Sequence, residues 1–262
     1  MKKIKKIIRK ILSKLYVLKH QNKFRYDDLE VNYLFDHSYG NKLAVIFSGF
    51  SENEKPAKYN YMSTLRKVRI NKLFILDNIG YMKRGGYYLG KYPEFNFEKA
   101  VSQLIRKIKI KYNITESYFC GSSKGGYASL YYGLKLGADA IVCGAPQYFV
   151  GDYLIKSHNE NILNYIISDK SEMKIEKINY LLREIIYNTT FHPRIYLHFS
   201  RNEHHYKEHV IHLIQDLTKR NHDLFIDEQK YCGHDEVGIY FSKYLKVTLE
   251  QLAQFKKGEK ND

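Results

Sequence analysis

Short apolar runs alternate with longer segments of helical periodicity along most of the chain. Such runs predict strands that are buried on both faces, as in a parallel sheet covered by helices. On this basis, strands are predicted at 43–50, 72–80, 116–122, 138–146, 194–200 and 222–229. Helices are predicted at 97–112, at 124–137, from after residue 200 to about residue 219, and at 236–255. The alternation predicts an α/β domain whose mostly parallel sheet has helices on both faces and binds ligands at the carboxyl ends of its strands.

One segment interrupts this alternation. Residues 151–190 have a helical pattern and contain no predicted strand. We interpret them as a small helical cap inserted into a domain that spans residues 26–262. A crossover that packs directly on the sheet is the alternative interpretation of the same pattern.

The first 25 residues differ from the rest of the chain in charge. They carry ten Lys and Arg and no Asp or Glu, in a chain whose formal net charge is +15. Ile and Leu recur there at three- and four-residue spacing, which predicts a basic amphipathic leader helix. No apolar run is long enough to span a bilayer, and charges interrupt every candidate secretory signal.

Three roles are open for this leader. It would bind an anionic membrane surface through residues 1–20, pack its apolar face on the domain, or contact nucleic acid. Nucleic acid is not an expected partner, because no RNA- or DNA-binding motif accompanies the charge. The expected location is cytoplasmic, and the first role would add peripheral binding at the inner membrane face. The sequence carries no signal of oligomeric state.

The cysteines and histidines give no metal-binding pattern. Cys120, Cys143 and Cys232 lie far apart and form no CxxC pair, so neither a disulfide framework nor a zinc site is expected. Separated cysteines in odd number favour a reducing compartment. His204 and His205 are adjacent, but no second ligand group with coordinating spacing accompanies them. No metal and no permanent cofactor are therefore expected.

The stretch Gly121-Ser122-Ser123-Lys124-Gly125 matches the pattern G-x-S-x-G. In this pattern the central serine lies on a strained turn between a strand and a helix, with its hydroxyl exposed above the sheet. The stretch follows a predicted strand and begins a predicted helix, which is the context that the pattern requires. Ser123 is therefore the predicted nucleophile. Glycines that only turn the chain, beside serines that cap the helix, are the alternative.

A serine nucleophile needs a base, and the base needs a group that orients it. His234 lies between the last predicted strand and the last helix, and it is the predicted base. Glu203 follows the preceding strand and is the predicted orienting carboxylate. The order Ser123, Glu203, His234 matches nucleophile, acid and base in one known arrangement. The alternatives are a loop histidine for His234 and, for Glu203, a glutamate favoured by the helix dipole.

An acyl-transfer site also needs two backbone N–H donors that stabilise the oxyanion. The amide of Lys124, directly after the serine, is one predicted donor, and the amide of Phe50 is the other. Phe50 lies in the turn after the first predicted strand, where Gly49 would let the backbone approach a substrate closely. An ordinary loop glycine is the alternative for Gly49.

With these residues the chain resembles proteins of the α/β-hydrolase fold over about residues 42–255. The matched positions are 48–50, 121–125, Glu203 and His234. The segment GSSKGGYASLYYGLKLGADAIVCGAPQ is also similar to segments of bacterial capsular polysaccharide biosynthesis proteins, glycan-modifying accessory Sec proteins and polysaccharide O-acetyltransferases. The chain departs from many relatives in having SGF in place of HG at the oxyanion turn, and Glu in place of Asp as the acid.

The resemblance implies acyl transfer through an acyl-serine, to water or to a sugar hydroxyl. The leading interpretation is O-acetylation of a bacterial surface or capsular glycan, with acetyl-CoA or another acyl donor as a substrate. A carboxylesterase or thioesterase that hydrolyses an acyl ester is one alternative. A non-catalytic scaffold of the same fold, in a capsule or secretion assembly, is the other.

Overall fold

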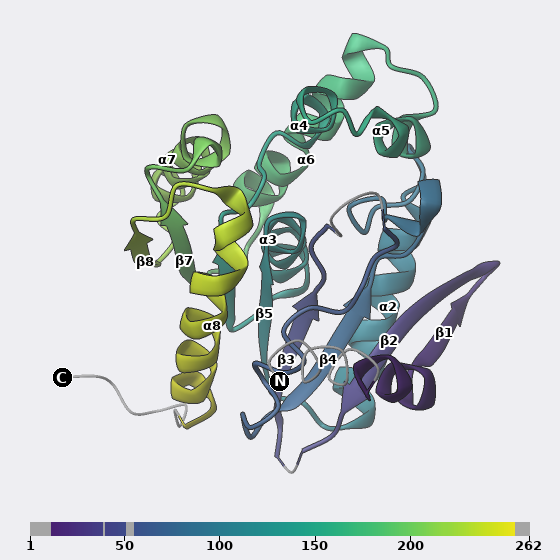
Figure 1. The fold of residues 1–262 in the computed structure, drawn as a ribbon, viewed down its shortest axis with the longest axis vertical. Helices are drawn as coiled ribbons and strands as arrows, with labels where there is room; N and C mark the ends of the chain where they lie inside the picture. The colour runs from purple at the N-terminus through teal and green to yellow at the C-terminus, as the bar shows by residue number, and fades with distance from the viewer. Residues whose placement is uncertain (1–11, 39, 51–54, 255–262) are drawn as a thin grey trace, which may run out of the picture.

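The computed structural model describes residues 12–38, 40–50 and 55–254 (Figure 1). Within them, eight strands form one sheet in the order β1-β2-β4-β3-β5-β6-β7-β8. The pairs β1–β2 and β2–β4 are antiparallel, and every other pair of neighbours is parallel, so the predicted mostly parallel sheet is confirmed. The strands are β1 (Asn22–Tyr26), β2 (Leu29–Asp36), β3 (Lys42–Phe47), β4 (Asn71–Leu76), β5 (Glu116–Ser122), β6 (Ala140–Gly144), β7 (Arg194–Ser200) and β8 (Leu224–Gln229).

The helices follow the predicted alternation from β4 onward. Three short turns also appear: the 3-10 turns η1 (Tyr81–Lys83) and η3 (His234–Glu236), and the π-helical turn η2 (Tyr206–Val210). The turn η2 continues directly into α7, within the single helix that the sequence predicts after residue 200. The α-helices are α2 (Asn96–Lys111), α3 (Lys124–Leu136), α4 (Val150–Lys156), α5 (Glu160–Ile167), α6 (Glu172–Asn188), α7 (Ile211–Lys219) and α8 (Val237–Gln254).

The hairpin β1–β2 at one edge of the sheet is absent from the sequence prediction. Its strands are only half buried, so they contain no continuous apolar run of the kind used to find the other six. The signal that does exist is alternation, because Leu29, Val31, Tyr33 and Phe35 occupy every second position of β2. The turn between the strands contains Asp27 at φ 48°.

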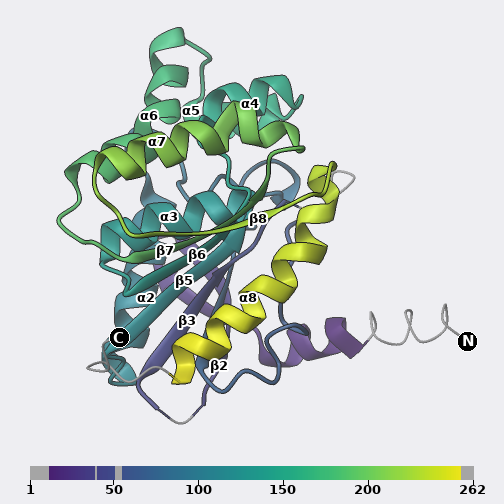
Figure 2. The ribbon, with the colours of Figure 1, turned by 90° about the vertical axis from the view of Figure 1, so that its left-hand side faces the viewer.

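Helices cover both faces of the sheet, as predicted. Alternate residues of the central strands enter opposite cores: Val45 and Phe47 of β3 join one core, and Ala44 and Ile46 join the other. The first core includes residues of α2, α3 and the helices α4–α7, whereas the second is covered by α8. Figure 2 shows α8 crossing one side of the sheet, with α2 and α3 on the opposite side.

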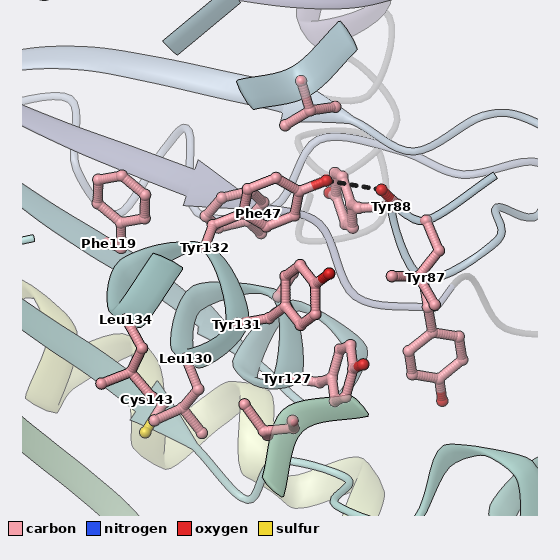
Figure 3. Packing of buried hydrophobic residues seen from close by; sticks show 14 of the residues in the cluster. Phe47, Tyr87, Tyr88, Phe119, Tyr127, Leu130, Tyr131, Tyr132, Leu134 and Cys143 are labelled. Atoms are coloured by element: carbon pink, nitrogen blue, oxygen red, sulfur yellow. Dashed lines mark hydrogen bonds between the residues drawn. The ribbon is translucent and has the colours of Figure 1, made fainter. Parts of the chain in front are cut away.

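An aromatic cluster supports the carboxyl end of β3 (Figure 3). The Phe47 ring stacks on Tyr132 of α3 at 5.3 Å between centroids and meets Tyr88 edge-on at 5.1 Å. The Tyr132 hydroxyl donates to the Tyr88 carbonyl at 2.6 Å. The Tyr88 hydroxyl in turn accepts a bond from the Ser48 amide at 2.5 Å. The turn that begins at Ser48 is therefore held by rings from two other segments.

The helices α4, α5 and α6 occupy the segment predicted to form the cap. In Figure 1 they lie above one end of the sheet, beyond α3. α5 contacts the loop after β4, because the Tyr92 amide donates to the Ile166 carbonyl at 2.7 Å. The division of the chain into leader, domain and cap insertion remains a prediction.

Residues 12–20 are helical, so the part of the predicted leader that the structure describes forms a helix. Val17 packs against the core beneath α8. Leu12, Leu15 and Leu18 are 59%, 55% and 80% exposed, so three apolar side chains of this helix face solvent. The remainder of the leader, residues 1–11, lies outside the described residues. None of the helices that the structure describes has the length and apolar character to cross a membrane.

Candidate active site

Four consecutive strands of the sheet place polar side chains at their carboxyl ends. Ser123 directly follows β5, and Gln147 lies in the loop after β6. Glu203 lies between β7 and η2, and His234 begins η3 after β8. Because β5, β6, β7 and β8 are parallel neighbours, their carboxyl ends lie along one edge of the sheet. The side chains of these loops meet there.

Ser123 has a strained backbone conformation, with φ 55° and ψ −122°. Non-glycine residues rarely adopt a positive φ, and such strain often accompanies functional sites. The neighbouring glycines allow the turn: a Cβ on Gly121 would overlap the Gly125 backbone, and one on Gly125 would lie 2.6 Å from the Phe47 carbonyl oxygen. The strand β5 and the helix α3 therefore approach each other more closely than side chains would permit.

The two adjacent serines have different surroundings. Ser122 is buried, and its hydroxyl is hydrogen-bonded to the Tyr61 hydroxyl. Ser123 is half buried, and its Oγ lies 2.9 Å from His234 Nε2. Of the two, Ser123 is thus the one in contact with an imidazole.

The structure brings the three predicted residues Ser123, His234 and Glu203 together. On the far side of the imidazole, His234 Nδ1 lies 3.1 Å from Glu203 Oε1. With an ionised carboxylate, Nδ1 carries the proton, and Nε2 is left to accept the serine proton. The catalytic roles assigned to these residues remain predictions, and the geometry is compatible with them.

Glu203 is almost fully buried and receives more than one hydrogen bond. Burial alone would raise its pKa, but hydrogen bonds from His205 and His234 outweigh burial and hold the pKa well below the usual value. The His205 imidazole contributes the shorter contact, with Nδ1 2.5 Å from Oε1, and its backbone amide donates to the same oxygen at 3.1 Å. The carboxylate therefore stays ionised beside both imidazoles.

Two side chains at this site were not identified from the sequence, Gln147 and His205. The Gln147 amide nitrogen donates to Ser123 Oγ at 2.6 Å and lies 3.4 Å from His205 Nε2. The His205 ring stacks on the His234 ring, with centroids 3.8 Å apart and planes at 24°. The rule that located Glu203 and His234, a polar side chain after a predicted strand, would also have pointed to Gln147, which follows β6.

The predicted oxyanion donors lie on either side of the serine turn. Lys124 is the first residue of α3, and first-turn amides have no intrahelical acceptor. Phe50 is half buried, and its ring stacks on Tyr153 of α4 with centroids 6.3 Å apart. The Gly49 amide donates to Asn60 Oδ1 at 3.0 Å, and an added Cβ would make only an ordinary contact with the Ser122 carbonyl. The functions predicted for Lys124, Phe50 and Gly49 stay predictions.

The Lys124 side chain points away from its own amide into a buried ion pair. Its ammonium lies 2.9 Å from Asp77 Oδ2, and neither side chain is exposed. Burial lowers the pKa of Lys124, and the Asp77 carboxylate opposes this shift. The sequence pattern predicts a role for the Lys124 backbone amide only, and nothing in it predicts this ion pair.

The histidines near Glu203 also form the one acid–imidazole group, among the described residues, whose atoms are close enough to hold a cation. One potential ligand atom from each of Glu203, His204 and His205 lies within 4.8 Å of the others. Glu203 Oε1 is, however, already shared by His205 Nδ1 and His234 Nδ1. The expectation that no metal binds here remains a prediction.

The architecture and the serine turn define the chain as a protein of the α/β-hydrolase fold. Among solved structures, the capsule O-acetyltransferase of Neisseria meningitidis serogroup A aligns with a TM-score of 0.74 and 23% identity, over 87% of this chain and 93% of that chain. The fluorophosphonate-binding serine hydrolase F of Staphylococcus aureus aligns with a TM-score of 0.67 and 12% identity, over 90% and 98% of the two chains. At these identities the similarity establishes the fold.

Two further comparisons concern glycosylation and secretion proteins. A chain of a glycosylation-associated protein complex of Streptococcus agalactiae aligns with a TM-score of 0.71 and 20% identity, over 88% of this chain and 46% of that chain. A protein of the accessory Sec system of Staphylococcus aureus is 29% identical over 111 residues. That match spans 42% of this chain and 20% of the curated relative's length. No protein-family model matches the chain.

Proposed function

We propose that this chain is a serine acyltransferase that O-acetylates a bacterial surface or capsular glycan through an acyl-serine. The observation that carries the proposal is the continuous contact from Ser123 Oγ to His234 to Glu203, on a strained turn at the carboxyl edge of the sheet. The structural similarity to a capsule O-acetyltransferase supports a glycan hydroxyl as the acceptor. A variant of that enzyme has been solved in complex with CoA, which supports an acyl-CoA as the donor.

In the proposed mechanism, His234 Nε2 takes the proton from the Ser123 hydroxyl as Oγ attacks the acyl carbonyl. Glu203 holds the Nδ1 proton of His234 and stabilises the imidazolium that forms. The amides of Lys124 and Phe50 would stabilise the oxyanion. Collapse breaks the bond to the thiolate of the donor, which leaves as a thiol with the proton from His234.

The second half of the reaction regenerates the serine. His234 deprotonates a sugar hydroxyl, whose oxygen attacks the acyl-serine. The acyl–Oγ bond then breaks, and Oγ recovers its proton from His234. The same steps with water in place of the sugar describe an esterase, so only the acceptor distinguishes transfer from hydrolysis.

A fluorophosphonate probe tests the nucleophile without requiring the natural substrate. Ser123 Oγ would displace fluoride at phosphorus, and the intact mass would rise by one probe adduct. We expect labelling of the wild type and of Ser122→Ala, and none of Ser123→Ala. An unlabelled wild type that is folded would instead favour the scaffold, and loss of labelling in Ser122→Ala alone would assign the reaction to the other serine.

A second assay separates transfer from hydrolysis. The wild type is incubated with acetyl-CoA and a de-O-acetylated capsular polysaccharide, and the free thiol and the mass of the glycan are both measured. Transfer predicts thiol release that depends on glycan, together with acetylated sugar. Thiol release at the same rate without glycan would identify a hydrolase. We expect Ser123→Ala to lower either rate by about 10⁴ or more.

For the leader we propose peripheral binding to an anionic membrane surface. Leu12, Leu15 and Leu18 are exposed apolar side chains within a segment that carries ten basic residues and no acidic ones. Apolar insertion and attraction to anionic lipid both add to such binding. We expect the full chain to float with phosphatidylglycerol vesicles and not with phosphatidylcholine vesicles.

Serine at all three leucine positions should abolish this flotation. Ile110→Ser is the matched control, because Ile110 of α2 is another highly exposed apolar residue. Equal flotation of the triple variant and the wild type would contradict the proposal.

A further inference from the structure

Five side chains at the candidate site form a closed ring of contacts, which extends beyond the three predicted residues. From Ser123 the ring passes through His234 and Glu203, as described above. It continues from Glu203 Oε1 to His205 Nδ1 at 2.5 Å, and from His205 Nε2 to the Gln147 amide nitrogen at 3.4 Å. It closes where Gln147 Nε2 donates to Ser123 Oγ at 2.6 Å.

Donor and acceptor chemistry determines the position of each proton in this ring. An ionised Glu203 only accepts, so His205 must donate to it through Nδ1–H. Burial lowers the pKa of His205, and Glu203 opposes this shift. The His205 imidazole is therefore neutral, and its Nε2 is a hydrogen-bond acceptor. Gln147 then offers one N–H to His205 and the other to Ser123. A reversed amide would place its oxygen against the bare Nε2 of His205, with no proton between them.

The carbonyl end of the same amide makes no compensating contact. Gln147 Oε1 is buried and has no hydrogen-bond partner among the described residues. A buried polar atom without a partner is costly and uncommon in folded proteins. The hydrogen bonds of the amide nitrogen to Ser123 and His205 therefore fix the orientation of this amide, although its oxygen is left without a partner.

We infer that Gln147 is a further catalytic residue, which donates a hydrogen bond to Ser123 Oγ, and that His205 is a positioning residue that fixes the direction of this donor. The inference rests on the proposed nucleophilic role of Ser123. The N–H of Gln147 occupies one lone pair of Oγ and directs the serine proton toward His234. It also stabilises Oγ as the leaving group when the acyl-serine breaks down.

The rate of fluorophosphonate labelling, measured by intact mass at several probe concentrations, tests this inference. Gln147→Ala should be labelled about 10- to 100-fold more slowly than the wild type. Loss of one hydrogen-bond donor to a reacting oxygen typically lowers the rate by about 10²–10³, so the expected decrease is at or below the lower end of that range. Gln147→Glu has almost the same shape but replaces the donor by an acceptor, so it should label more slowly still. Gln103→Glu is the matched control, because it makes the same change at an exposed position of α2.

His205→Phe keeps a ring against His234 and removes both ring nitrogens. If His205 acts through Gln147, His205→Phe should slow labelling in the wild type but have little effect, about 2-fold or less, in the Gln147→Ala background. A merely structural role would lower the melting temperature and slow labelling in both backgrounds. His212→Asn, at an exposed position of α7, controls for the loss of a histidine.

A variant-free measurement covers the case in which His205→Phe does not fold. In wild-type protein labelled with ¹⁵N-histidine, the ring nitrogens of His205 should report the neutral Nδ1–H tautomer at pH 7. The opposite tautomer, or an imidazolium, would overturn the assignment of His205. If the wild type is labelled and both Gln147 variants are labelled at the same rate as the wild type, the inference is overturned and the proposed function stands. Failure of the wild type to label would overturn both.

Discussion

Lys124 and Asp77 form a buried ion pair directly behind the serine turn, and replacing the lysine tests how much this pair stabilises the fold. Both side chains have no exposed area, and the ammonium and carboxylate are 2.9 Å apart. Asp77 also accepts hydrogen bonds from the Gly86 and Tyr88 amides. The Lys124 ammonium lies 5.1 Å from the centre of the Phe50 ring. The pair thus connects the helix after the serine to the turn after β3.

Lys124→Met keeps the length of the side chain and removes its charge. Loss of one partner of a buried pair typically costs about 3–5 kcal/mol, because the remaining charge is left uncompensated. Since the two amides still donate to Asp77, we expect a loss near the lower limit, about 3 kcal/mol. For a chain of this size, 1 kcal/mol corresponds to about 2–4 °C, so the melting temperature should fall by about 6–12 °C.

Urea unfolding followed by circular dichroism at pH 7 measures this loss. Adding Asp77→Asn removes the second charge, and the amide oxygen can still accept from Gly86 or Tyr88. The double variant should therefore be more stable than the two single losses predict, by at least about 1 kcal/mol. Lys177→Met is the control, because its ion pair with Glu184 is exposed and should change stability by less than about 0.5 kcal/mol. A Lys124→Met loss no larger than this control would refute the reasoning.

Three other outcomes follow from contacts at the site. Gly125→Ala would place a Cβ 2.6 Å from the Phe47 carbonyl oxygen at the end of β3, so it should lower both the melting temperature and the fluorophosphonate labelling rate; unchanged values for both would contradict the close approach of β3 and α3. Tyr61→Phe removes the partner of Ser122 and should cost about 1 kcal/mol in urea unfolding while labelling persists, whereas lost labelling would implicate Ser122. The pKa of Glu203 is lower in the folded protein than in the unfolded chain. The ionised Glu203 side chain therefore contributes to stability above the unfolded pKa of about 4.3, and this contribution is lost as the pH falls through the folded pKa. Urea unfolding between pH 3 and 6 should therefore show a steeper loss for the wild type than for Glu203→Gln, and parallel curves would contradict the lowered pKa.

The fold was predictable from the sequence wherever strands are buried on both faces. β5 and β7 begin and end where the sequence predicts, because all of β5 and most of β7 is buried. The predicted strand at 43–50 extends past the end of β3, since the apolar Phe50 belongs to the following turn. The half-exposed hairpin β1–β2 was missed because its signal is alternation, which a search for continuous apolar runs does not detect.

The candidate site was predictable where one rule sufficed, namely that function lies at the carboxyl ends of parallel strands. This rule and the G-x-S-x-G pattern identified Ser123, Glu203 and His234 as candidates, and the structure places them in contact. Gln147 and His205 also follow strands of this edge, but the rule alone does not choose among the polar residues there, and neither residue has a motif of its own. Their contacts arise only when the loops after β6 and β7 converge, so their proposed roles depend on three-dimensional neighbours that local sequence does not specify.

The register of β8 against β7 determines where His234 lies. Burial of apolar side chains fixes this register only weakly. Phe225 and Ile226 of β8 are 45% and 53% exposed, so a shift by one residue would not move a buried set of side chains to the surface. A polar contact between the two strands fixes the register instead. His198 of β7 is directly opposite Asp227 of β8, and its Nδ1 lies 2.6 Å from the carboxylate.

This contact has a consequence for the site, although neither residue reaches Ser123. A strand advances about 3.3 Å per residue, so a slip of β8 by one residue would displace the loop that carries His234 by more than the 2.9 Å contact with Ser123 Oγ can tolerate. A second bond holds the same loop, because Ser200 at the end of β7 donates to the Tyr231 carbonyl at 2.6 Å. The position of the imidazole over the serine therefore follows from polar pairing between the last two strands, and the residues that secure it lie outside the site itself.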